Sequence, residues 1–201
     1  MSNEKNSKFV DFYFDVGSPA AYLAWTQMPK LIEETGATIN YKPMYISGVF
    51  KLTGNDTPIT VPAKGKWIFQ DFARWAKRYD VPLVVNSKFP VNSLYMMRGI
   101  IAYKDDKQFM DLTDAMFDAM WVSNKDVTNP EVMAEIASSV NIDINQFAKK
   151  LQTIDTKQIL IDATQEAVDR GAFGAPTFFV GEEMHFGQDR FEFISEALNS
   201  I

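Results

Sequence analysis

The first forty residues alternate between apolar and mixed segments in a way that predicts a strand, a helix and a second strand. Residues 9–14 are aromatic and β-branched and predict a buried strand. Ser18 and Pro19 form the usual start of a helix, an N-cap followed by proline, and Gly36 is typical of a helix end. Residues 38–42 predict the second strand. The opening therefore predicts a βαβ unit with parallel strands and a right-handed crossover.

From about residue 60 to 170 the hydrophobic positions follow a helical period. Ile68, Phe72, Trp75 and Tyr79 have the spacing i, i+4, i+7 and i+11 of one helix face. Further helices are predicted near residues 92–103, 107–122, 130–139, 143–152 and 156–170. We interpret these apolar stripes as core packing.

The C-terminal part returns to a β pattern. Residues 177–180 and 184–186 predict an antiparallel hairpin, and Asp189 has the position of an N-cap for a last helix over residues 190–198. The order is βαβ, a helical block, then αββα. This predicts an α/β fold with a thioredoxin-like core and a large all-helical insertion. We assign 1–60 and 165–201 to the thioredoxin-like domain and 61–164 to the insertion domain.

Composition and charge exclude several classes of function. The chain has 201 residues and a net charge of −6, with no cluster of Lys and Arg, which argues against nucleic-acid and anionic-membrane partners. Its apolar runs are too short to cross a bilayer. Residues 1–8 lack the features of a targeting segment, so we expect a cytoplasmic protein.

The chain contains no cysteine and only one histidine, His185. Disulfides, thiolate metal sites, cysteine nucleophiles and multi-histidine metal sites are therefore excluded, and no metal site is predicted. His185 lies in the predicted hairpin without a nucleophile-elbow sequence upstream, so we expect a half-exposed strand histidine. Any thiol that this protein uses must arrive with a ligand.

The start of the first helix is the reactive position of a thioredoxin-like core, because its free N–H groups and dipole stabilise an anion. Ser18 occupies that position, either as a simple N-cap or as a donor to the thiolate of a bound ligand. Ala175 and Pro176 directly precede the third core strand. A cis bond between them would free the Ala175 backbone to pair with an extended ligand, whereas a trans bond would be an ordinary strand start.

Several motifs together resemble one family. They are FYFDVGSPAAYLA at 12–24, TGN at 53–55, VPAK at 61–64, RWA at 74–76, GAFGAPTFFV at 171–180 and FGQDR at 186–190. In this order they resemble the 2-hydroxychromene-2-carboxylate isomerase family, which belongs with the kappa-class glutathione transferases in the DsbA-like group. The resemblance covers almost the whole chain.

The resemblance implies a bound glutathione. Ser18 would donate to its sulfur, and Ala175, before a cis Pro176, would pair with its cysteinyl unit. The γ-glutamyl end would be received by Gly187, Gln188, Asp189 and Arg190, and the glycyl end or the substrate carboxylate by Asn55 and Lys64. Each polar group also has a structural interpretation, because Asp189 suits an N-cap, Asn55 a turn and Lys64 a solvated surface.

The implied activity is glutathione-dependent cis–trans isomerisation of an aryl-substituted unsaturated 2-oxo acid, a small aromatic substrate, by a homodimer in aromatic catabolism. A kappa-class glutathione S-transferase and a non-catalytic thioredoxin-like binding module are the alternatives. We expect the insertion to line the pocket for the second substrate, with Trp67, Phe89 and Asn92 as candidates.

Overall fold

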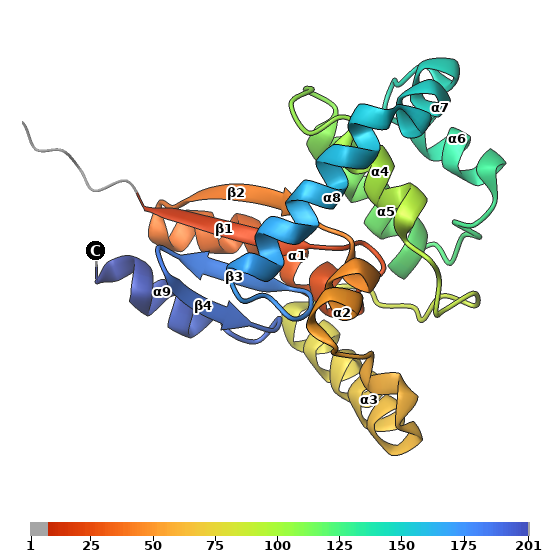
Figure 1. The fold of residues 1–201 in the computed structure, drawn as a ribbon. Helices are drawn as coiled ribbons and strands as arrows, with labels where there is room; N and C mark the ends of the chain where they lie inside the picture. The colour runs from red at the N-terminus through yellow and green to blue at the C-terminus, as the bar shows by residue number, and fades with distance from the viewer. Residues whose placement is uncertain (1–7, 201) are drawn as a thin grey trace, which may run out of the picture.

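The computed structural model describes residues 8–200 and contains a four-stranded sheet, which lies to the left in Figure 1. Its strands are β1 (Phe9–Phe14), β2 (Thr38–Pro43), β3 (Thr177–Val180) and β4 (Glu183–Phe186), in the order β2-β1-β3-β4. β1 and β2 are parallel, and β3 is antiparallel to both β1 and β4. The sheet confirms the predicted βαβ opening and the C-terminal hairpin.

The helical segments of residues 8–200 also follow the predicted order. They are α1 (Pro19–Thr35), α2 (Ile46–Thr53), the 3-10 helix η1 (Pro58–Thr60), α3 (Pro62–Tyr79), α4 (Leu94–Ile101), α5 (Phe109–Trp121), α6 (Pro130–Ser139), α7 (Ile144–Gln152), α8 (Ile154–Asp169) and α9 (Phe191–Asn199). The sequence did not predict α2 or η1. α2 begins after Tyr45, whose side chain makes no capping hydrogen bond, and Gly48 interrupts its short apolar pattern, so the usual start signal is missing.

α1 follows β1 because the residues at its ends favour a helix start and stop. The Ser18 hydroxyl oxygen accepts a hydrogen bond from the N–H of Ala21 at 3.2 Å, and Pro19 lies in the first turn. Gly36 ends the helix with a φ of 68°, which glycine adopts without strain. The structure confirms the predicted helix and places Ser18 at the end of the sheet.

Helices cover both faces of the sheet, with α1 and α9 on one face and α8 on the other (Figure 1). On the α1 face the ring of Phe12 stacks on Phe178, with ring centroids 4.8 Å apart. On the opposite face the Tyr13 hydroxyl donates to Glu166 of α8 at 2.7 Å. Because both faces are covered, β1 is apolar along most of its length, as the sequence pattern indicated.

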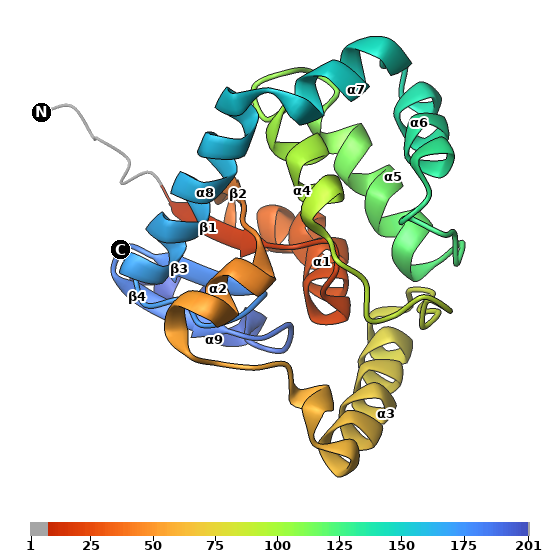
Figure 2. The ribbon, with the colours of Figure 1, turned by 45° about the vertical axis from the view of Figure 1, so that its right-hand side comes forward.

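The helical insertion is held to the sheet around the end of β1. The indole N–H of Trp121 donates to the Val16 carbonyl at 2.7 Å, and the Ser93 hydroxyl donates to Asp15 at 2.8 Å. Figure 2 shows α4, α5, α6 and α7 gathered together, whereas α3 projects away from them with its N-terminal end outermost. α8 runs continuously through residues 164 and 165, and the division into two domains there stays a prediction.

Two details of the C-terminal segment differ from the predictions. The N-cap of α9 is Arg190, without a side-chain capping bond, so the N-cap interpretation of Asp189 is wrong. His185 is buried, with 7% of its surface exposed, where we expected a half-exposed side chain. It lies opposite Phe178 in the β3–β4 ladder, and burial lowers its pKa.

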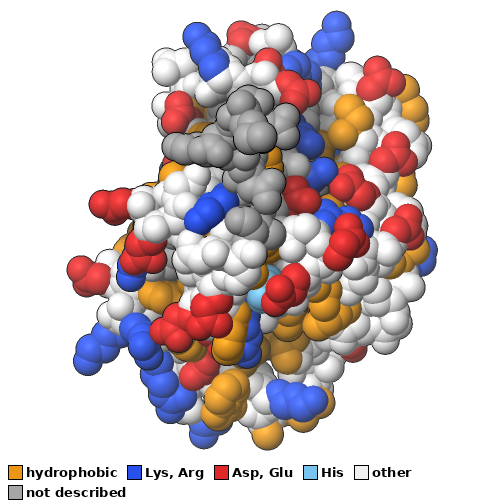
Figure 3. Space-filling view, turned by 90° about the vertical axis from the view of Figure 1, so that its left-hand side faces the viewer, with side chains coloured by type: hydrophobic (Ala, Val, Ile, Leu, Met, Phe, Trp, Pro, Cys, Tyr) orange, Lys and Arg blue, Asp and Glu red, His pale blue; other side chains and the backbone are white. Residues whose placement is uncertain are grey.

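Side chains of both charges are mixed on the surface. On the face shown in Figure 3, acidic and basic side chains are interspersed, and neither sign covers the face. Within residues 8–200 no helix is both long and apolar enough to span a bilayer.

Candidate functional site

Ser18 lies where the first helix meets the loop before β3. Its side chain is buried, and its hydroxyl donates to the Ala175 carbonyl at 3.0 Å while it accepts from the Ala21 N–H. The N-cap interpretation is therefore confirmed. The same hydroxyl also touches the second predicted site segment, and the N-terminus of α1 provides the partial positive charge that favours an anion there.

The Ala175–Pro176 segment forms the facing wall, and its peptide bond is cis. Among residues 8–200 the N–H of Ala175 donates to no backbone acceptor. The Pro176 carbonyl accepts from the N–H of Gly187 at 3.1 Å, which places the loop after β4 beside this wall. Ser18, Ala175, Pro176 and Gly187 thus form a continuous chain of contacts, although they come from distant parts of the sequence.

The loop of residues 187–190 has a conformation that depends on glycine. Gly187 has a φ of 111°, and a Cβ atom there would lie 2.8 Å from Oδ1 of Asp189. The Asp189 carboxylate forms an ion pair with Arg190 at 3.5 Å. Gln188 is buried and presents its carbonyl to the interior. The loop that the Gly187 hydrogen bond attaches to the Ala175–Pro176 wall therefore carries one acid and one base.

Tyr79, at the end of α3, is a site contact that the sequence did not reveal as one. Its hydroxyl donates to the Gln188 carbonyl at 2.6 Å, across 109 residues of sequence. Burial raises the pKa of Tyr79 to about 12, with a further contribution from Asp189, so the hydroxyl stays protonated at neutral pH. In the sequence Tyr79 was visible only as part of a helix stripe.

Asp15 is a second contact that sequence analysis missed. It is fully buried, and its carboxylate accepts from the N–H of Gly17 at 2.7 Å, the N–H of Ile46 at 2.8 Å and the Ser93 hydroxyl at 2.8 Å. Burial raises the pKa of Asp15 to about 6, although these three hydrogen bonds act in the opposite direction. One feature of the sequence could have identified Asp15: it is an acid that directly follows an apolar strand, three residues before Ser18.

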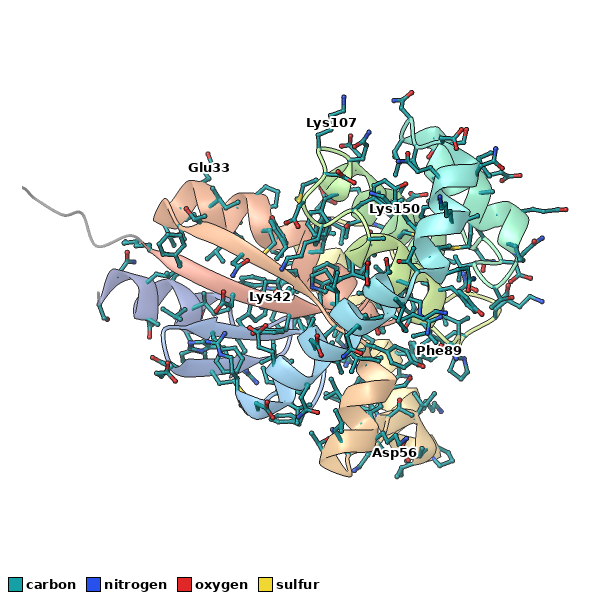
Figure 4. The ribbon with its side chains drawn as sticks, turned by 45° about the horizontal axis from the view of Figure 1, so that its top comes forward. Glu33, Lys42, Asp56, Phe89, Lys107 and Lys150 are labelled. Atoms are coloured by element: carbon teal, nitrogen blue, oxygen red, sulfur yellow. The ribbon has the colours of Figure 1, made fainter. Side chains whose placement is uncertain are left out.

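The two residues predicted for the glycyl end lie in different surroundings. The Asn55 side-chain amide donates to the Phe173 carbonyl at 2.8 Å, so Asn55 lies at the edge of the Ala175–Pro176 wall. Lys64 is exposed in the first turn of α3. Along the helix it is about 22 Å from Tyr79, and Figure 2 shows this end of α3 projecting outward. Figure 4 labels Asp56, the neighbour of Asn55, in the segment that leads from α2 to this end of α3.

The three candidates for a second-substrate pocket have different surroundings. Trp67 is 57% exposed on α3, and the ring of Phe89, marked in Figure 4, packs against Trp121 with centroids 5.6 Å apart. Asn92 lines a separate apolar cavity of about 510 Å³ between α4, α6 and α7, next to Tyr95. Phe89 and Asn92 both belong to the loop between α3 and α4, and a pocket shared by the three residues stays a prediction.

The chain is similar to known proteins in sequence and in fold. The model of the DSBA-like thioredoxin domain matches residues 9–199. The chain belongs to the DsbA-like thioredoxin family. A probable DsbA oxidoreductase from Streptomyces coelicolor shares this fold with a TM-score of 0.80 at 15% identity, covering 96% of this chain and 89% of that structure.

Within the DsbA-like family the chain is similar to enzymes of two kinds. It is 30% identical to a 2-hydroxychromene-2-carboxylate isomerase of Sphingobium xenophagum over 96% of this chain and 98% of that protein. It is 28% identical to glutathione S-transferase kappa 1 of Caenorhabditis elegans over 94% and 90%. The solved structure of a 2-hydroxychromene-2-carboxylate isomerase superimposes with a TM-score of 0.85 at 28% identity, over 96% of this chain and 95% of that one.

Proposed function

We propose that this protein is a glutathione-dependent isomerase of an aryl-substituted unsaturated 2-oxo acid, of the 2-hydroxychromene-2-carboxylate isomerase type. The observation that carries the proposal is the position of the Ser18 hydroxyl, at the N-terminus of α1 and 3.0 Å from the Ala175 carbonyl. In a chain without cysteine, this geometry suits a thiol that arrives with the ligand.

The residues of the site fit the chemical groups of glutathione. The Ser18 hydroxyl can turn from the Ala175 carbonyl to the ligand sulfur, and the Ala175 N–H and carbonyl can then pair with the cysteinyl unit. The loop of Gly187, Gln188, Asp189 and Arg190 lies beside them with both signs of charge, as the amino-acid head of a γ-glutamyl group requires.

Glutathione would supply a thiolate that adds reversibly to a conjugated double bond and so permits rotation about it. The protein's part is to stabilise that thiolate with Ser18 and the N–H groups of α1, and to donate hydrogen bonds to the oxygen on which negative charge develops. Asn55 is suited to the second task because it already lies at the edge of the Ala175 wall. We assign Lys64 to the substrate carboxylate, which it would attract from its exposed position.

A kappa-class glutathione S-transferase is the second candidate function, favoured by the 28% identity to the Caenorhabditis elegans protein. The two activities need the same glutathione site and differ in whether the thiol is returned or stays on the product. A binding module without catalysis would keep the same fold.

A thermal-unfolding titration with glutathione tests the shared part of both enzyme proposals. At a glutathione concentration about 100 times its Kd, the protein gains about 2.7 kcal/mol of stability, which corresponds to a Tm increase of roughly 5–10 °C for a chain of this size. No shift up to millimolar glutathione contradicts both enzyme functions.

Once binding is established, the absorbance of a hydroxybenzylidenepyruvate-type substrate separates the remaining functions. An isomerase changes the substrate spectrum and leaves the concentration of free thiol constant. A transferase consumes thiol in proportion to product. Glutathione binding with no change in any such substrate supports the binding module instead.

A further inference from the structure

Asp15 is a buried acid to which the proposed function gives no role. It directly follows β1, lies three residues before Ser18 and has no exposed surface. Among residues 8–200 no Lys, Arg or His forms an ion pair with it. A buried carboxylate without a cation is costly, so a position that only closes a loop is better filled by a neutral side chain. The carboxylate must therefore be explained by the groups that it contacts.

Asp15 holds the turn that leads into α1. Its Oδ1 atom accepts the N–H of Gly17 at 2.7 Å, and its main-chain carbonyl accepts the N–H of Ser18 at 3.0 Å. Ser18 follows with a φ of −96° and a ψ of 119°, and its hydroxyl reaches the Ala175 carbonyl at 3.0 Å. The orientation of Ser18 thus depends on two hydrogen bonds that one residue accepts.

The second carboxylate oxygen joins this turn to two further helices. Oδ2 accepts the N–H of Ile46, the first residue of α2, at 2.8 Å and the hydroxyl of Ser93, which directly precedes α4, at 2.8 Å. The turn also packs closely against α4, because a Cβ atom on Gly17 would lie 3.0 Å from the Cβ atom of Ser93. The start of α1, the start of α2 and the helical insertion therefore meet at one carboxylate.

A carboxylate is the side chain that can make all of these contacts together. It accepts one hydrogen bond on Oδ1 and two on Oδ2. The amide of asparagine has the same shape but only one acceptor oxygen, and its other end is a donor. Asparagine would therefore turn a donor either toward Gly17 or toward Ile46 and Ser93.

We propose that Asp15 is a positioning residue of the glutathione site, which holds Ser18 and the first N–H groups of α1 in place for the ligand thiolate and ties them to the helical insertion through Ser93. The inference rests on the proposed function and deepens it. The charge of Asp15 acts in the opposite sense, because a nearby anion disfavours a thiolate. Loss of positioning raises the pKa of the bound thiol, whereas loss of the charge alone lowers it.

Titration of the ultraviolet thiolate absorbance in the glutathione complex separates these two effects. The variants are Asp15→Asn and Ser93→Ala, and the control is Thr164→Val. Thr164 is also buried, and its hydroxyl accepts the N–H of Tyr45, next to Ile46, at 3.0 Å but makes no hydrogen bond to Asp15. We expect the thiol pKa to rise in Asp15→Asn, so that the ratio of thiolate to thiol at neutral pH falls about tenfold. Ser93→Ala should show a smaller rise, and Thr164→Val should titrate as the wild type does.

Binding of S-methylglutathione, which cannot form a thiolate, shows whether the rest of the site is intact. All three variants should bind it with wild-type affinity. If Asp15→Asn does not fold, Ser93→Ala decides alone, because it keeps the carboxylate and removes only one of its hydrogen bonds.

Other outcomes overturn the positioning role. A thiol pKa that is unchanged or lower in Asp15→Asn and Ser93→Ala rejects it, and so does an equal rise in Thr164→Val. Weaker binding of S-methylglutathione in step with the change in thiol pKa would indicate general damage to the site and also rejects it. A wild-type protein that binds neither glutathione nor S-methylglutathione refutes the proposed function itself, whereas wild-type thiolate titrations in both variants refute only the role of Asp15.

Discussion

The candidate site has an inner side and an outer arm that differ in how their polar groups are held. On the inner side, Asp15 and Ser18 are buried and make short hydrogen bonds to groups from three parts of the chain. On the outer arm, Asn55 makes one exposed hydrogen bond and Lys64 is exposed at the projecting end of α3. The family motifs include residues of both regions.

Because of this difference, residues of the two regions contribute differently to stability and to ligand binding. An inner group is part of the folded structure whether or not a ligand is bound, so its loss changes stability as well as function. An outer group is exposed to solvent, so it contributes little to stability and acts mainly by attracting a charged ligand. Variants of the inner side should therefore have the larger effects, and those of the arm the smaller ones.

The largest effect is expected for Asp15→Ala. It leaves three donors, the part-buried N–H groups of Gly17 and Ile46 and the buried Ser93 hydroxyl, without their acceptor. We expect a loss of about 3 kcal/mol in the free energy of unfolding, measured by urea denaturation. Asp162→Ala, at an exposed position on α8, is the control and should change stability by less than about 0.5 kcal/mol. Similar losses in the two variants would show that the inner hydrogen bonds are not structural.

Ionisation of Asp15 should also make stability depend on pH. Burial raises its pKa in the folded protein from 3.8 to about 6. Because the folded protein favours the protonated carboxyl, Asp15 contributes fully to the free energy of unfolding at a pH below its ordinary pKa. This contribution is lost as the pH rises through about 6. Relative to Asp15→Asn, the wild type should lose about 2 kcal/mol between pH 4 and pH 6. Parallel stability curves for the two proteins over this range would contradict the shifted pKa.

Most of the fold was predictable because local signals agree with the tertiary structure. The apolar residues of β1, the Ser18-Pro19 start of α1 and the Asn129-Pro130 start of α6 each appear in the structure. α2 was not predicted because it is short, lacks a capping bond and contains Gly48. Asp189 was misassigned as an N-cap because its carboxylate turns back over Gly187 and the helix begins one residue later.

The site was predictable only where it is local in sequence. Ser18 and the segment of Ala175 and Pro176 are marked by neighbouring residues. Tyr79 comes to the site through packing of α3 against a loop more than 100 residues away, and a stripe of hydrophobic residues carries no sign of that partner.

Ser18→Ala tests whether the inner hydroxyl has a role beyond the helix cap. Loss of the cap should cost about 1 kcal/mol of stability, and the pKa of the thiol of bound glutathione should rise because a donor to its anion is removed. The measurement is a titration of the ultraviolet thiolate absorbance in the complex. Thr153→Ala removes a similar hydroxyl cap from α8 and should cost similar stability without changing the thiol pKa. An unchanged thiolate titration in Ser18→Ala would leave only the capping role.

Tyr79→Phe tests the attachment of α3 to the inner loop. Removal of the hydroxyl should cost about 1 kcal/mol of stability and weaken glutathione binding a few-fold, because the loop of Gln188 and Asp189 is less well positioned. Tyr22→Phe is the matched control, since the Tyr22 hydroxyl donates to the Pro82 carbonyl at 2.7 Å, away from that loop. Calorimetric titration should show an affinity change only for Tyr79→Phe. An equal change in both variants would indicate a general loss of packing.

The smallest effect is expected on the outer arm. Lys64→Gln should leave the free energy of unfolding within about 0.5 kcal/mol of the wild type. If Lys64 attracts the substrate carboxylate through solvent, the variant should raise the KM for a 2-oxo acid about two- to threefold at low ionic strength, and the difference should vanish in high salt. Lys66→Gln, nearby on the same helix, controls for the general loss of charge. A large, salt-independent effect at Lys64 would mean that this lysine makes a direct contact in the complex, and that α3 moves inward to make it.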